Sequence, residues 1–512
     1  MIQPVQGNSM NSLADLIEQH AQRTPQQIAV RCVSARDGQA AAVFDYATMW
    51  RRIERISGHL SETWRIAPGD RVACLGFNHE LQISLLFACM RVGAMLAPLN
   101  IRLALPELAA IVQQAGVRVL WFDEAHRTQA EALQARLAGL HALEIGSIHD
   151  LVIHPSPKGL TYAPVDPHTP ALLAYTSGTT GEPKGAVHTQ AALLANARAS
   201  WWAHDMSAAD HVLSVLPLFH VGGLCIQTLP ALLCGASVTL HARFDAGAWL
   251  DAVRTDRPTL SLMVPATLRA VLGHAGWADA DLSSLRGVMA GSSVVPRAYI
   301  DAFHERGVPL GQVYGATETG PVSIVLKFAR AMRKPGSTGM PCPGVEIRLV
   351  RHGKDVAPGE VGEIWVRGAN LMQGYWGAPD HPAFVDGWFH SGDLARCDAE
   401  GDYEVVGRSK EMIISGGENI YPAEIENWLV GLPGVAECAV IGVSDERWGE
   451  VPVAVLSLHQ AGSLDADAVL AFLGERIARY KLPRRIVFLP ALPKSALGKV
   501  QKAVLRDELA KG

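Results

Sequence analysis

The amino-acid sequence predicts an α/β fold with three parts. These are a large N-terminal domain of αβ-layered subdomains, a small barrel-like β subdomain, and a small α+β C-terminal domain. The first 150 residues alternate helical and strand-like patterns, which is typical of layered α/β folds. After about Val345 the pattern changes to short alternating strands with Gly and Pro turns between them. The last hundred residues combine two helical patterns with two strand-like ones.

The N-terminal part begins with a helix. Leu13 starts its apolar pattern, and Asn11 and Ser12 are candidate caps. Several prolines between 155 and 170 mark a loop-rich connection. Buried strands are predicted at 71–76, 118–122, 236–240 and 260–264.

The C-terminal third contains shorter elements. A helix is predicted at 423–432, with Pro422 at its start and Pro433 beyond its end. A second helix is predicted at 466–479. Strands are predicted at 346–350, 362–366, 439–443 and 451–458.

Length, charge and cysteine usage limit the class of protein. A chain of 512 residues is expected to form two to four domains or subdomains. A formal charge of −5, from 45 basic and 50 acidic residues, gives no reason to expect nucleic acid as a partner. The eight cysteines show no C-x-x-C pair and no metal-ligand spacing, so they are expected to be reduced and mostly buried in a cytoplasmic protein.

No segment is predicted to target or cross a membrane. Residues 1–13 lack both a basic start and an apolar run, so no secretory signal is expected. The most apolar window, 83–105, is interrupted by Arg91, Asn100 and Arg102. It is therefore expected to be a core segment and not an integral membrane span.

The most informative segment is 175–185, which reads Tyr-Thr-Ser-Gly-Thr-Thr-Gly-Glu-Pro-Lys-Gly. Glycines let backbone N–H groups approach a polyphosphate closely, and the hydroxyls and one lysine add donors. It is not a Walker A loop, because Glu182 and Pro183 separate Gly181 from Lys184. Composition alone leaves a flexible surface loop as an equal alternative.

This loop resembles the phosphate-binding signature of the adenylate-forming superfamily, which includes acyl- and aryl-CoA synthetases. The similarity extends from about Leu13 to about Leu509 and most resembles bacterial acid:CoA ligases, including 4-chlorobenzoate and 4-coumarate CoA ligases and fatty-acyl-CoA synthetases. Five further motifs agree in order and spacing: Leu216-Pro-Leu-Phe-His-Val-Gly-Gly223, Tyr314-Gly-Ala-Thr-Glu-Thr-Gly320, Ser391-Gly-Asp-Leu394, Gly407-Arg-Ser-Lys-Glu-Met-Ile-Ile-Ser-Gly-Gly-Glu-Asn-Ile420 and Pro493-Lys-Ser-Ala-Leu-Gly-Lys499.

The resemblance implies a division of labour between domains. Residues 1–407 are expected to bind ATP and the acid, 408–410 to form a hinge that turns at Lys410, and 411–512 to form a mobile lid that carries the catalytic lysine. The implied reaction has two steps, in which the acid and Mg·ATP give an acyl-adenylate and coenzyme A then displaces AMP.

Joining a carboxylate to AMP brings an anion onto a polyanion, so the site must neutralise charge. By resemblance, Glu318 binds Mg²⁺, Thr317 contacts the α-phosphate, and Lys499 is the catalytic lysine. Other lysines at 494, 502 and 511 share the neighbourhood of Lys499, but only Lys499 has the position that the motif requires.

Other residues are expected to hold the nucleotide. Asp393 resembles the carboxylate that accepts both ribose hydroxyls, and Arg408 the arginine that contacts the ribose. The resemblance also assigns to ATP Thr176, Ser177, Gly178, Thr179, Thr180, Gly181, Lys184, Ser292, Ser293, Tyr314, Gly315 and Ala316.

The resemblance places the acid and coenzyme A as well. A lone histidine among apolar residues is usually a core residue, but the motif of His220 implies that it separates the acid site from the pantetheine tunnel. The acyl pocket is expected to contain His220, Val221, Gly222, Gly291, Gly315, Pro321 and Val322. Coenzyme A is expected to contact Gly416, Gly417, Trp448, Tyr480 and Arg484.

The sequence also bears on other classes of enzyme. The sequence has no Gly-x-Ser-x-Gly elbow, so nothing supports a serine hydrolase. Within the superfamily, the rivals are an adenylation enzyme that loads an acyl carrier protein and a luciferase-like oxygenase. A non-catalytic nucleotide-binding scaffold predicts loss of Lys499 or Glu318, and both are present.

The acid itself is less defined. No lysine or arginine lies among the acyl-pocket candidates, which disfavours a dicarboxylate. A benzoate or hydroxycinnamate and a medium-chain fatty acid both fit, and analogy with aryl-CoA ligases favours the aromatic acid slightly. The expected partners are thus a small carboxylic acid, ATP and coenzyme A, and the family suggests a homodimer.

Overall fold

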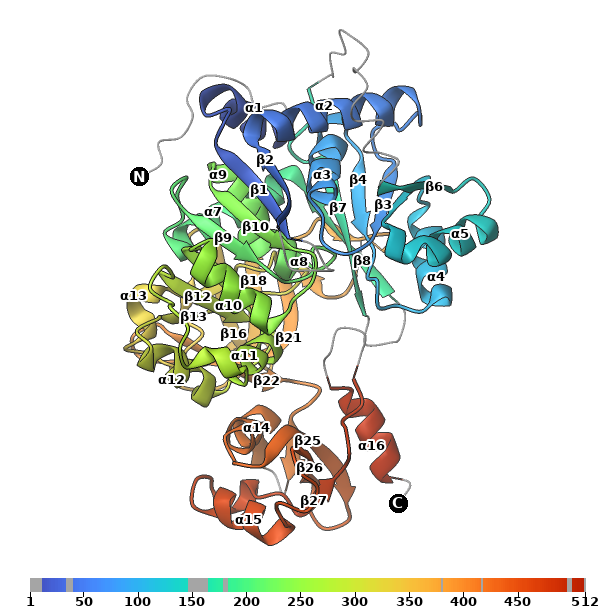
Figure 1. The fold of residues 1–512 in the computed structure, drawn as a ribbon. Helices are drawn as coiled ribbons and strands as arrows, with labels where there is room; N and C mark the ends of the chain where they lie inside the picture. The colour runs from blue at the N-terminus through green and yellow to red at the C-terminus, as the bar shows by residue number, and fades with distance from the viewer. Residues whose placement is uncertain are drawn as a thin grey trace.

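The computed structural model describes residues 12–33, 40–145, 164–177, 183–378, 381–415, 418–494 and 500–510. Two α/β sheets form most of the N-terminal domain, and a third, antiparallel sheet precedes the C-terminal domain in sequence. The C-terminal domain lies at the opposite end of the molecule from the N-terminal helices α1 (Ala14–Arg23) and α2 (Tyr46–Glu62) (Figure 1). The predicted fold class is confirmed.

The first sheet has nine strands in the order β15-β14-β13-β12-β11-β9-β10-β1-β2. Its inner strands are parallel and its two edges are antiparallel. Parallel neighbours need long crossover connections, and helices supply several of them. The strands are β1 (Ile28–Val33), β2 (Ala40–Asp45), β9 (His211–Ser214), β10 (Ser237–His241), β11 (Leu260–Met263), β12 (Gly287–Gly291), β13 (Leu310–Tyr314), β14 (Ile324–Leu326) and β15 (Met340–Pro341); helices following these strands are α10 (Ala246–Thr255), α11 (Pro265–Leu272), α12 (Arg297–Glu305) and α13 (Phe328–Ala331).

The second sheet has seven strands in the order β19-β8-β7-β4-β3-β5-β6. Strands β7 and β8 form an antiparallel pair, so the predicted phosphate loop connects two adjacent strands. The strands are β3 (Arg71–Leu75), β4 (Met95–Pro98), β5 (Val119–Phe122), β6 (His141–Glu144), β7 (Pro170–Ser177), β8 (Pro183–Thr189) and β19 (Gly374–Tyr375); its helices are α3 (Glu80–Val92), α4 (Leu105–Ala115) and α5 (Arg127–Arg136).

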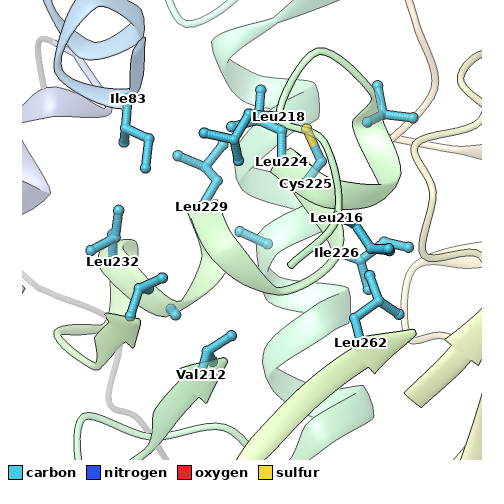
Figure 2. Close-up of a cluster of buried hydrophobic side chains, with 14 of the residues drawn as sticks. Ile83, Val212, Leu216, Leu218, Leu224, Cys225, Ile226, Leu229, Leu232 and Leu262 are labelled. Atoms are coloured by element: carbon cyan, nitrogen blue, oxygen red, sulfur yellow. The ribbon is translucent and has the colours of Figure 1, made fainter. Parts of the chain in front are cut away.

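One large apolar core contains side chains from both sheets. Helix α3 is buried on nearly every side and residues 92–99 are buried, which confirms most of the apolar window at 83–105 as core, although residues 100–105 lie nearer the surface. Its one deeply buried carboxylate, Glu80, is paired with Arg52 at 3.0 Å. Figure 2 shows the part of this core around α9 (Leu229–Cys234), where Leu216, Ile226 and Leu262 lie close together. Within the described residues, no helix is both long and apolar enough to cross a membrane.

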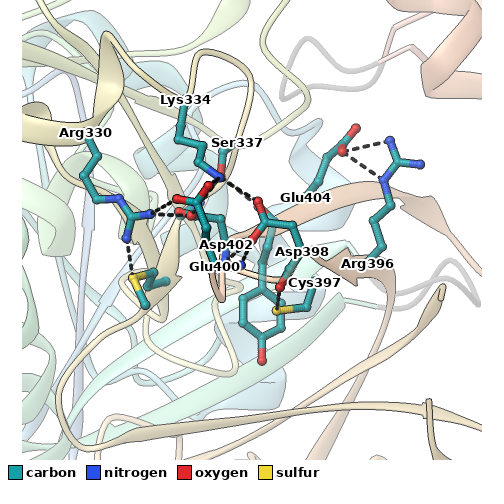
Figure 3. A network of polar contacts seen from close by, with 12 residues as sticks. Arg330, Lys334, Ser337, Arg396, Cys397, Asp398, Glu400, Asp402 and Glu404 are labelled. Carbon is teal, nitrogen blue, oxygen red and sulfur yellow. Dashed lines mark hydrogen bonds and ion pairs between the residues drawn. The ribbon is translucent and has the colours of Figure 1, made fainter. Parts of the chain in front are cut away.

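The third sheet is antiparallel, as its short alternating strands predict. An ion-pair network connects the turn between β21 and β22 to the segment after β14 (Figure 3). There Arg330 pairs with Asp402, and Lys334 contacts Asp398 at 2.8 Å and Glu400 at 2.9 Å. The strands are β16 (Val345–Arg351), β17 (Lys354–Asp355), β18 (Gly362–Gly368), β20 (Phe384–Val385), β21 (Trp388–Cys397) and β22 (Tyr403–Arg408).

The C-terminal domain packs its helices against a small mixed sheet with its own apolar core. The predicted helix at 466–479 is too long, because α15 ends at Gly474. Glycine is about 1 kcal/mol less favourable than alanine inside a helix, so the chain leaves the helix there. The elements are β23 (Ile413–Ser415), β24 (Glu418–Ile420), α14 (Pro422–Val430), β25 (Val435–Asp445), β26 (Gly449–Leu458), α15 (Ala466–Gly474), a 3-10 turn (Arg479–Lys481), β27 (Arg485–Phe488) and α16 (Lys502–Ala510).

The cysteines are unpaired, as their scattered positions predict, and five of the eight are buried. Burial raises the pKa of Cys74 and Cys225 to about 12, so both are uncharged small apolar groups at neutral pH.

Candidate active site

Loops from all three sheets of the N-terminal domain meet around one group of charged side chains. Lys184 comes from β8 and Tyr375 from β19, while Glu318 lies in the loop between β13 and β14. Asp393 and Arg408 face each other on the paired strands β21 and β22. Residues far apart in the sequence therefore contribute to a single polar region.

The carboxylate of Asp393 is held by two donors. The Tyr314 hydroxyl donates to its Oδ2 atom at 2.8 Å, and Arg408 Nε lies 2.9 Å from its Oδ1 atom. Asp393 is 6% exposed, so its carboxylate is largely shielded from water, whereas the Arg408 side chain is 55% exposed. The charge of Asp393 raises the pKa of Arg408, and burial together with Asp393 raises the pKa of Tyr314, so Tyr314 keeps its proton.

The loop that carries Glu318 is compact. The hydroxyl of Thr319 accepts from the Ala316 amide at 2.9 Å, and Asn370 donates to the Thr319 carbonyl at 2.6 Å. A Cβ atom on Gly315 would lie 2.5 Å from the carbonyl carbon of Pro321, so only glycine fits this turn.

The side chain of Glu318 has one short contact. Tyr375 is 8% exposed and donates its hydroxyl to Glu318 Oε1 at 2.7 Å. Burial, followed by the charge of Glu318, raises the pKa of Tyr375, which fixes the phenol as a donor. Glu318 is also near enough to Arg408 to raise the pKa of that guanidinium. The carboxylate is thus held in a position from which a hard cation can bind it.

Lys184 and His381 meet beside this carboxylate. The Nζ atom of Lys184 lies 3.0 Å from His381 Nε2, and His381 Nδ1 accepts from the Ala383 amide at 3.2 Å. A neutral imidazole has only one acceptor nitrogen, so Nε2 carries a proton once Nδ1 is the acceptor. Two donors then lie side by side, and an anionic oxygen placed next to both could accept from both.

The phosphate-loop prediction is only partly covered by the structure. Thr176 pairs with Lys184 in the β7–β8 ladder, and its hydroxyl lies 3.4 Å from the Lys184 carbonyl oxygen. Ser177 ends β7. The remaining predicted residues of the loop, Gly178, Thr179, Thr180 and Gly181, lie outside the described residues.

The predicted adenine segment follows the end of β12. Ser292 and Ser293 are exposed, and Ser292 has a φ of 75°, a conformation that L-residues rarely adopt. A Cβ atom on Gly291 would lie 2.5 Å from the Val313 carbonyl oxygen. The small size of Gly291 is therefore required by the packing of β12 against β13.

The predicted acyl-pocket residues lie in three segments, of which the one with Gly291 is described above. His220 is the N-cap of the short helix α8 (Val221–Gly223), where its Nδ1 accepts from the Gly222 amide at 3.1 Å. Val221 is 5% exposed. On the other segment Val322 is fully buried, and its amide donates to Asn196 at 3.2 Å.

In the C-terminal domain, the structure brings together two of the residues predicted to bind coenzyme A. The guanidinium of Arg484 lies 5.7 Å from the ring centroid of Trp448. Tyr480, on the adjacent 3-10 turn, is 48% exposed. Gly416, Gly417 and the predicted catalytic Lys499 lie outside the described residues, as does the predicted cap Asn11.

The lysines near Lys499 that the structure describes have carboxylate partners. Lys494 lies 2.5 Å from Glu437, while Lys502 contacts Glu411 at 3.1 Å and Glu426 at 2.8 Å. All three ion pairs lie within the C-terminal domain and make these two lysines part of its own packing.

Sequence reasoning did not identify Tyr375, His381 or Asn370. None lies in one of the recognised motifs, and each reaches the Glu318 loop or Lys184 from a distant part of the chain. The only available signal was the Gly-Tyr-Trp sequence at 374–376, which reads as an ordinary strand end.

The fold and this group of residues define an ATP-dependent enzyme that activates carboxylic acids, an acid–thiol ligase. The AMP-binding enzyme family matches residues 17–376, and the AMP-binding enzyme C-terminal domain matches residues 424–499. The chain belongs to this family of AMP-forming ligases.

Similar proteins include acid:CoA ligases along their full length. The chain is 45% identical to an indoleacetate–CoA ligase of Aromatoleum aromaticum, with 98% of each chain covered. It is 43% identical to a feruloyl-CoA synthase of an Amycolatopsis species, over 95% of this chain and 96% of the relative. Among solved structures, the anthranilate CoA ligase in complex with anthranoyl-AMP has a TM-score of 0.89 at 27% identity, with 98% of both chains covered.

Proposed function

We propose that this protein is an aromatic acid:CoA ligase that forms an acyl-adenylate from ATP and then a thioester with coenzyme A. The observation that carries this is the continuous group of charged side chains from Lys184, through Glu318, to Asp393 and Arg408. It offers donors for a polyphosphate next to an acceptor for a diol. The names of the similar enzymes support an aromatic acid as the substrate.

Asp393 and Arg408 are the proposed ribose contacts. A buried carboxylate beside a guanidinium can accept from both hydroxyls of a ribose, because an ionised carboxylate is an acceptor-only group. Tyr314 fixes the orientation of this carboxylate.

Lys184 and His381 are proposed to bind the β- and γ-phosphates. A phosphate oxygen that contacts both Lys184 Nζ and His381 Nε2 would supply the acceptor that these two donors need. Thr317 is proposed to contact the α-phosphate, where the acid attacks.

Glu318 is proposed to hold Mg²⁺, which would neutralise charge on the phosphates. The residues fit this ion, because Mg²⁺ takes one or two carboxylate ligands beside phosphate oxygens, and Glu318 is held by Tyr375. Lys499 is the proposed catalytic lysine. In the second step, the C-terminal domain is proposed to turn at Lys410, so that the segment with Gly416, Gly417 and Trp448 guides coenzyme A.

Loading of an acyl carrier protein is the second candidate. A fatty acid–acyl-carrier-protein ligase of Streptomyces coeruleorubidus is 34% identical over 97% of this chain, and its lower identity makes it weaker support than the acid:CoA ligases above.

Pyrophosphate release from ATP tests the proposal. Indole- and phenylacetates, benzoates, hydroxycinnamates and fatty acids of different chain lengths are each supplied with and without coenzyme A. We expect turnover with an aromatic acid that rises sharply when coenzyme A is present. Release that ignores coenzyme A would point to a carrier protein, and turnover of fatty acids alone would contradict the aromatic substrate.

The role of Lys499 has its own test. Lys499→Ala should abolish adenylation but spare thioester formation from supplied acyl-adenylate. An equal loss of both half-reactions would contradict the proposed division of labour.

A further inference from the structure

A small cavity lies next to the segment that follows His220. It is lined by the end of β9, by the helical segment after His220 and by β11. Figure 2 shows Val212, Leu216 and Leu262 around this region. The lining residues are Val212, Ser214, Val215, Leu216, Gly223, Gln227, Thr228 and Leu262.

One polar group in this lining has no partner. Gln227 is 2% exposed, and its Nε2 atom lies 3.5 Å from the Ser261 carbonyl oxygen. Its Oε1 atom has no hydrogen bond to any described residue. Exchanging the positions of the amide nitrogen and oxygen of Gln227 would place Oε1 against the Ser261 carbonyl oxygen, and two acceptors repel each other. The Oε1 atom therefore stays on the side where it has no hydrogen-bond donor. An unsatisfied buried acceptor costs about 1–3 kcal/mol.

The neighbouring hydroxyls cannot satisfy Gln227. Thr228 donates its hydroxyl to the Gly223 carbonyl at 2.6 Å. Ser214 lies 2.8 Å from the Thr228 hydroxyl, and since the Thr228 proton is already used, Ser214 is the donor of that pair. Both protons are therefore engaged within the wall, and neither hydroxyl donates to Gln227.

The local backbone is unusual at the same place. Residues Leu224–Thr228 form a π-helical turn that follows α8 directly. Such turns are rare and occur frequently at functional sites. The turn connects Gln227 to His220, which the proposed function places next to the acid.

We propose that Gln227 determines specificity by accepting a hydrogen bond from an N–H or O–H group on the ring of the acid. This inference rests on the proposed function. The cavity has room for about one water molecule in the present side-chain arrangement, so a ring must displace Leu216 or Leu262 to reach Gln227. The preferred substrates are then aromatic acids with a phenol or a ring N–H.

A site built to accept a hydrogen bond discriminates against a ligand that lacks the donor, because the buried acceptor stays unpaired. A cost of about 1–3 kcal/mol corresponds to a preference of roughly 5- to 160-fold in kcat/KM. The comparison must therefore use pairs of acids that differ only in the donor.

The experiment measures kcat/KM by pyrophosphate release for three such pairs. They are indole-3-acetate with its 1-methyl derivative, 4-hydroxyphenylacetate with phenylacetate, and 4-hydroxycinnamate with cinnamate. We expect the wild type to prefer the donor-bearing acid about tenfold or more in at least one pair. Gln227→Met should remove that preference by losing turnover of the donor-bearing acid while keeping turnover of its partner.

Gln82→Met is the matched control. Gln82 is also a buried glutamine, 6% exposed, but its Nε2 donates to the Gly76 and Phe77 carbonyls and it does not line the cavity. This variant should lower stability without changing the preference between paired acids.

Two results would overturn the inference. One is a wild type that treats all pairs alike, and the other is a preference that Gln227→Met leaves intact, which would mean that Gln227 binds a water molecule only. If no acid releases pyrophosphate, the proposed function fails. The same pairs are then compared by the shift that each causes in the unfolding temperature of wild type and Gln227→Met, which needs no turnover.

Discussion

The hydroxyl of Tyr375 donates a hydrogen bond to the proposed Mg²⁺ ligand, Glu318. Partners of this kind fix a metal ligand, and their loss typically lowers metal affinity or activity 10- to 100-fold. We expect Tyr375→Phe to raise the Mg²⁺ concentration that gives half-maximal adenylation about tenfold. Initial rates measured against free Mg²⁺ check this, and Glu318→Gln should lose more. An unchanged Mg²⁺ dependence would show that the hydroxyl serves packing alone.

The contact between Lys184 and His381 predicts a difference between ATP and AMP. If His381 contacts the outer phosphates, His381→Ala should weaken ATP binding about tenfold and leave AMP binding unchanged. Asp393→Asn should weaken both, because both nucleotides carry the ribose. Titration calorimetry with each nucleotide measures these affinities directly. A loss of AMP affinity in His381→Ala would mean that the residue acts on the fold of the site and not on the phosphates.

At the scale of elements, helix α11 of the N-terminal domain contacts strand β25 of the C-terminal domain. Arg269 donates to the Ala436 carbonyl at 2.5 Å and to Glu437 Oε1 at 3.1 Å, both on β25. Glu437 also accepts from Lys494, just before the segment that leads to Lys499. The ion pair is specific to this orientation of the two domains, so its loss should change how often the orientation is occupied.

We expect Arg269→Ala to change the two half-reactions in opposite directions, each about two- to fivefold, because a partly exposed ion pair contributes about 0.5–1 kcal/mol. The rate of adenylation is measured by pyrophosphate release. The rate of thioester formation is measured separately, starting from supplied acyl-adenylate. Arg297→Ala removes an exposed pair with Asp301 inside α12 and should leave both rates unchanged. Equal changes in both half-reactions would argue against an effect on domain orientation.

At the scale of the whole molecule, two buried histidines connect stability to pH. Burial lowers the pKa of His188 and His204 to about 4. An unfolded histidine has a pKa of about 6.5, so between these values the unfolded chain binds protons that the folded chain does not. The contribution of these two histidines to the free energy of unfolding should therefore be complete above about pH 6.5 and decrease as the pH drops towards 4.

Each histidine should account for up to about 3 kcal/mol of this loss. Urea unfolding at pH 7, 6 and 5 measures it. His204→Leu should flatten the decrease between pH 7 and 5, although it also loses the contact of His204 with the Ser200 carbonyl. His459→Leu, at an exposed position, should keep the wild-type slope. An equal slope in all three proteins would show that His204 is not the source.

The sequence by itself determined the α/β class, the family and the positions of several strands. Strands such as β3 and β5 are short apolar runs whose burial follows from composition, and the Glu318 and Asp393 motifs are continuous in the chain. It did not predict the end of α15, because the weak helix preference of Gly474 competes with a favourable pattern around it.

Only the tertiary structure decided which distant residues meet. Tyr375 reaches Glu318, and His381 reaches Lys184, because loops from three sheets converge, and no periodicity in the chain encodes that. The unpaired oxygen of Gln227 is likewise invisible in the sequence, where a glutamine in an apolar helix is unremarkable. Local patterns specify burial and hydrogen bonding within an element, whereas the partners of a buried polar atom depend on how the elements pack.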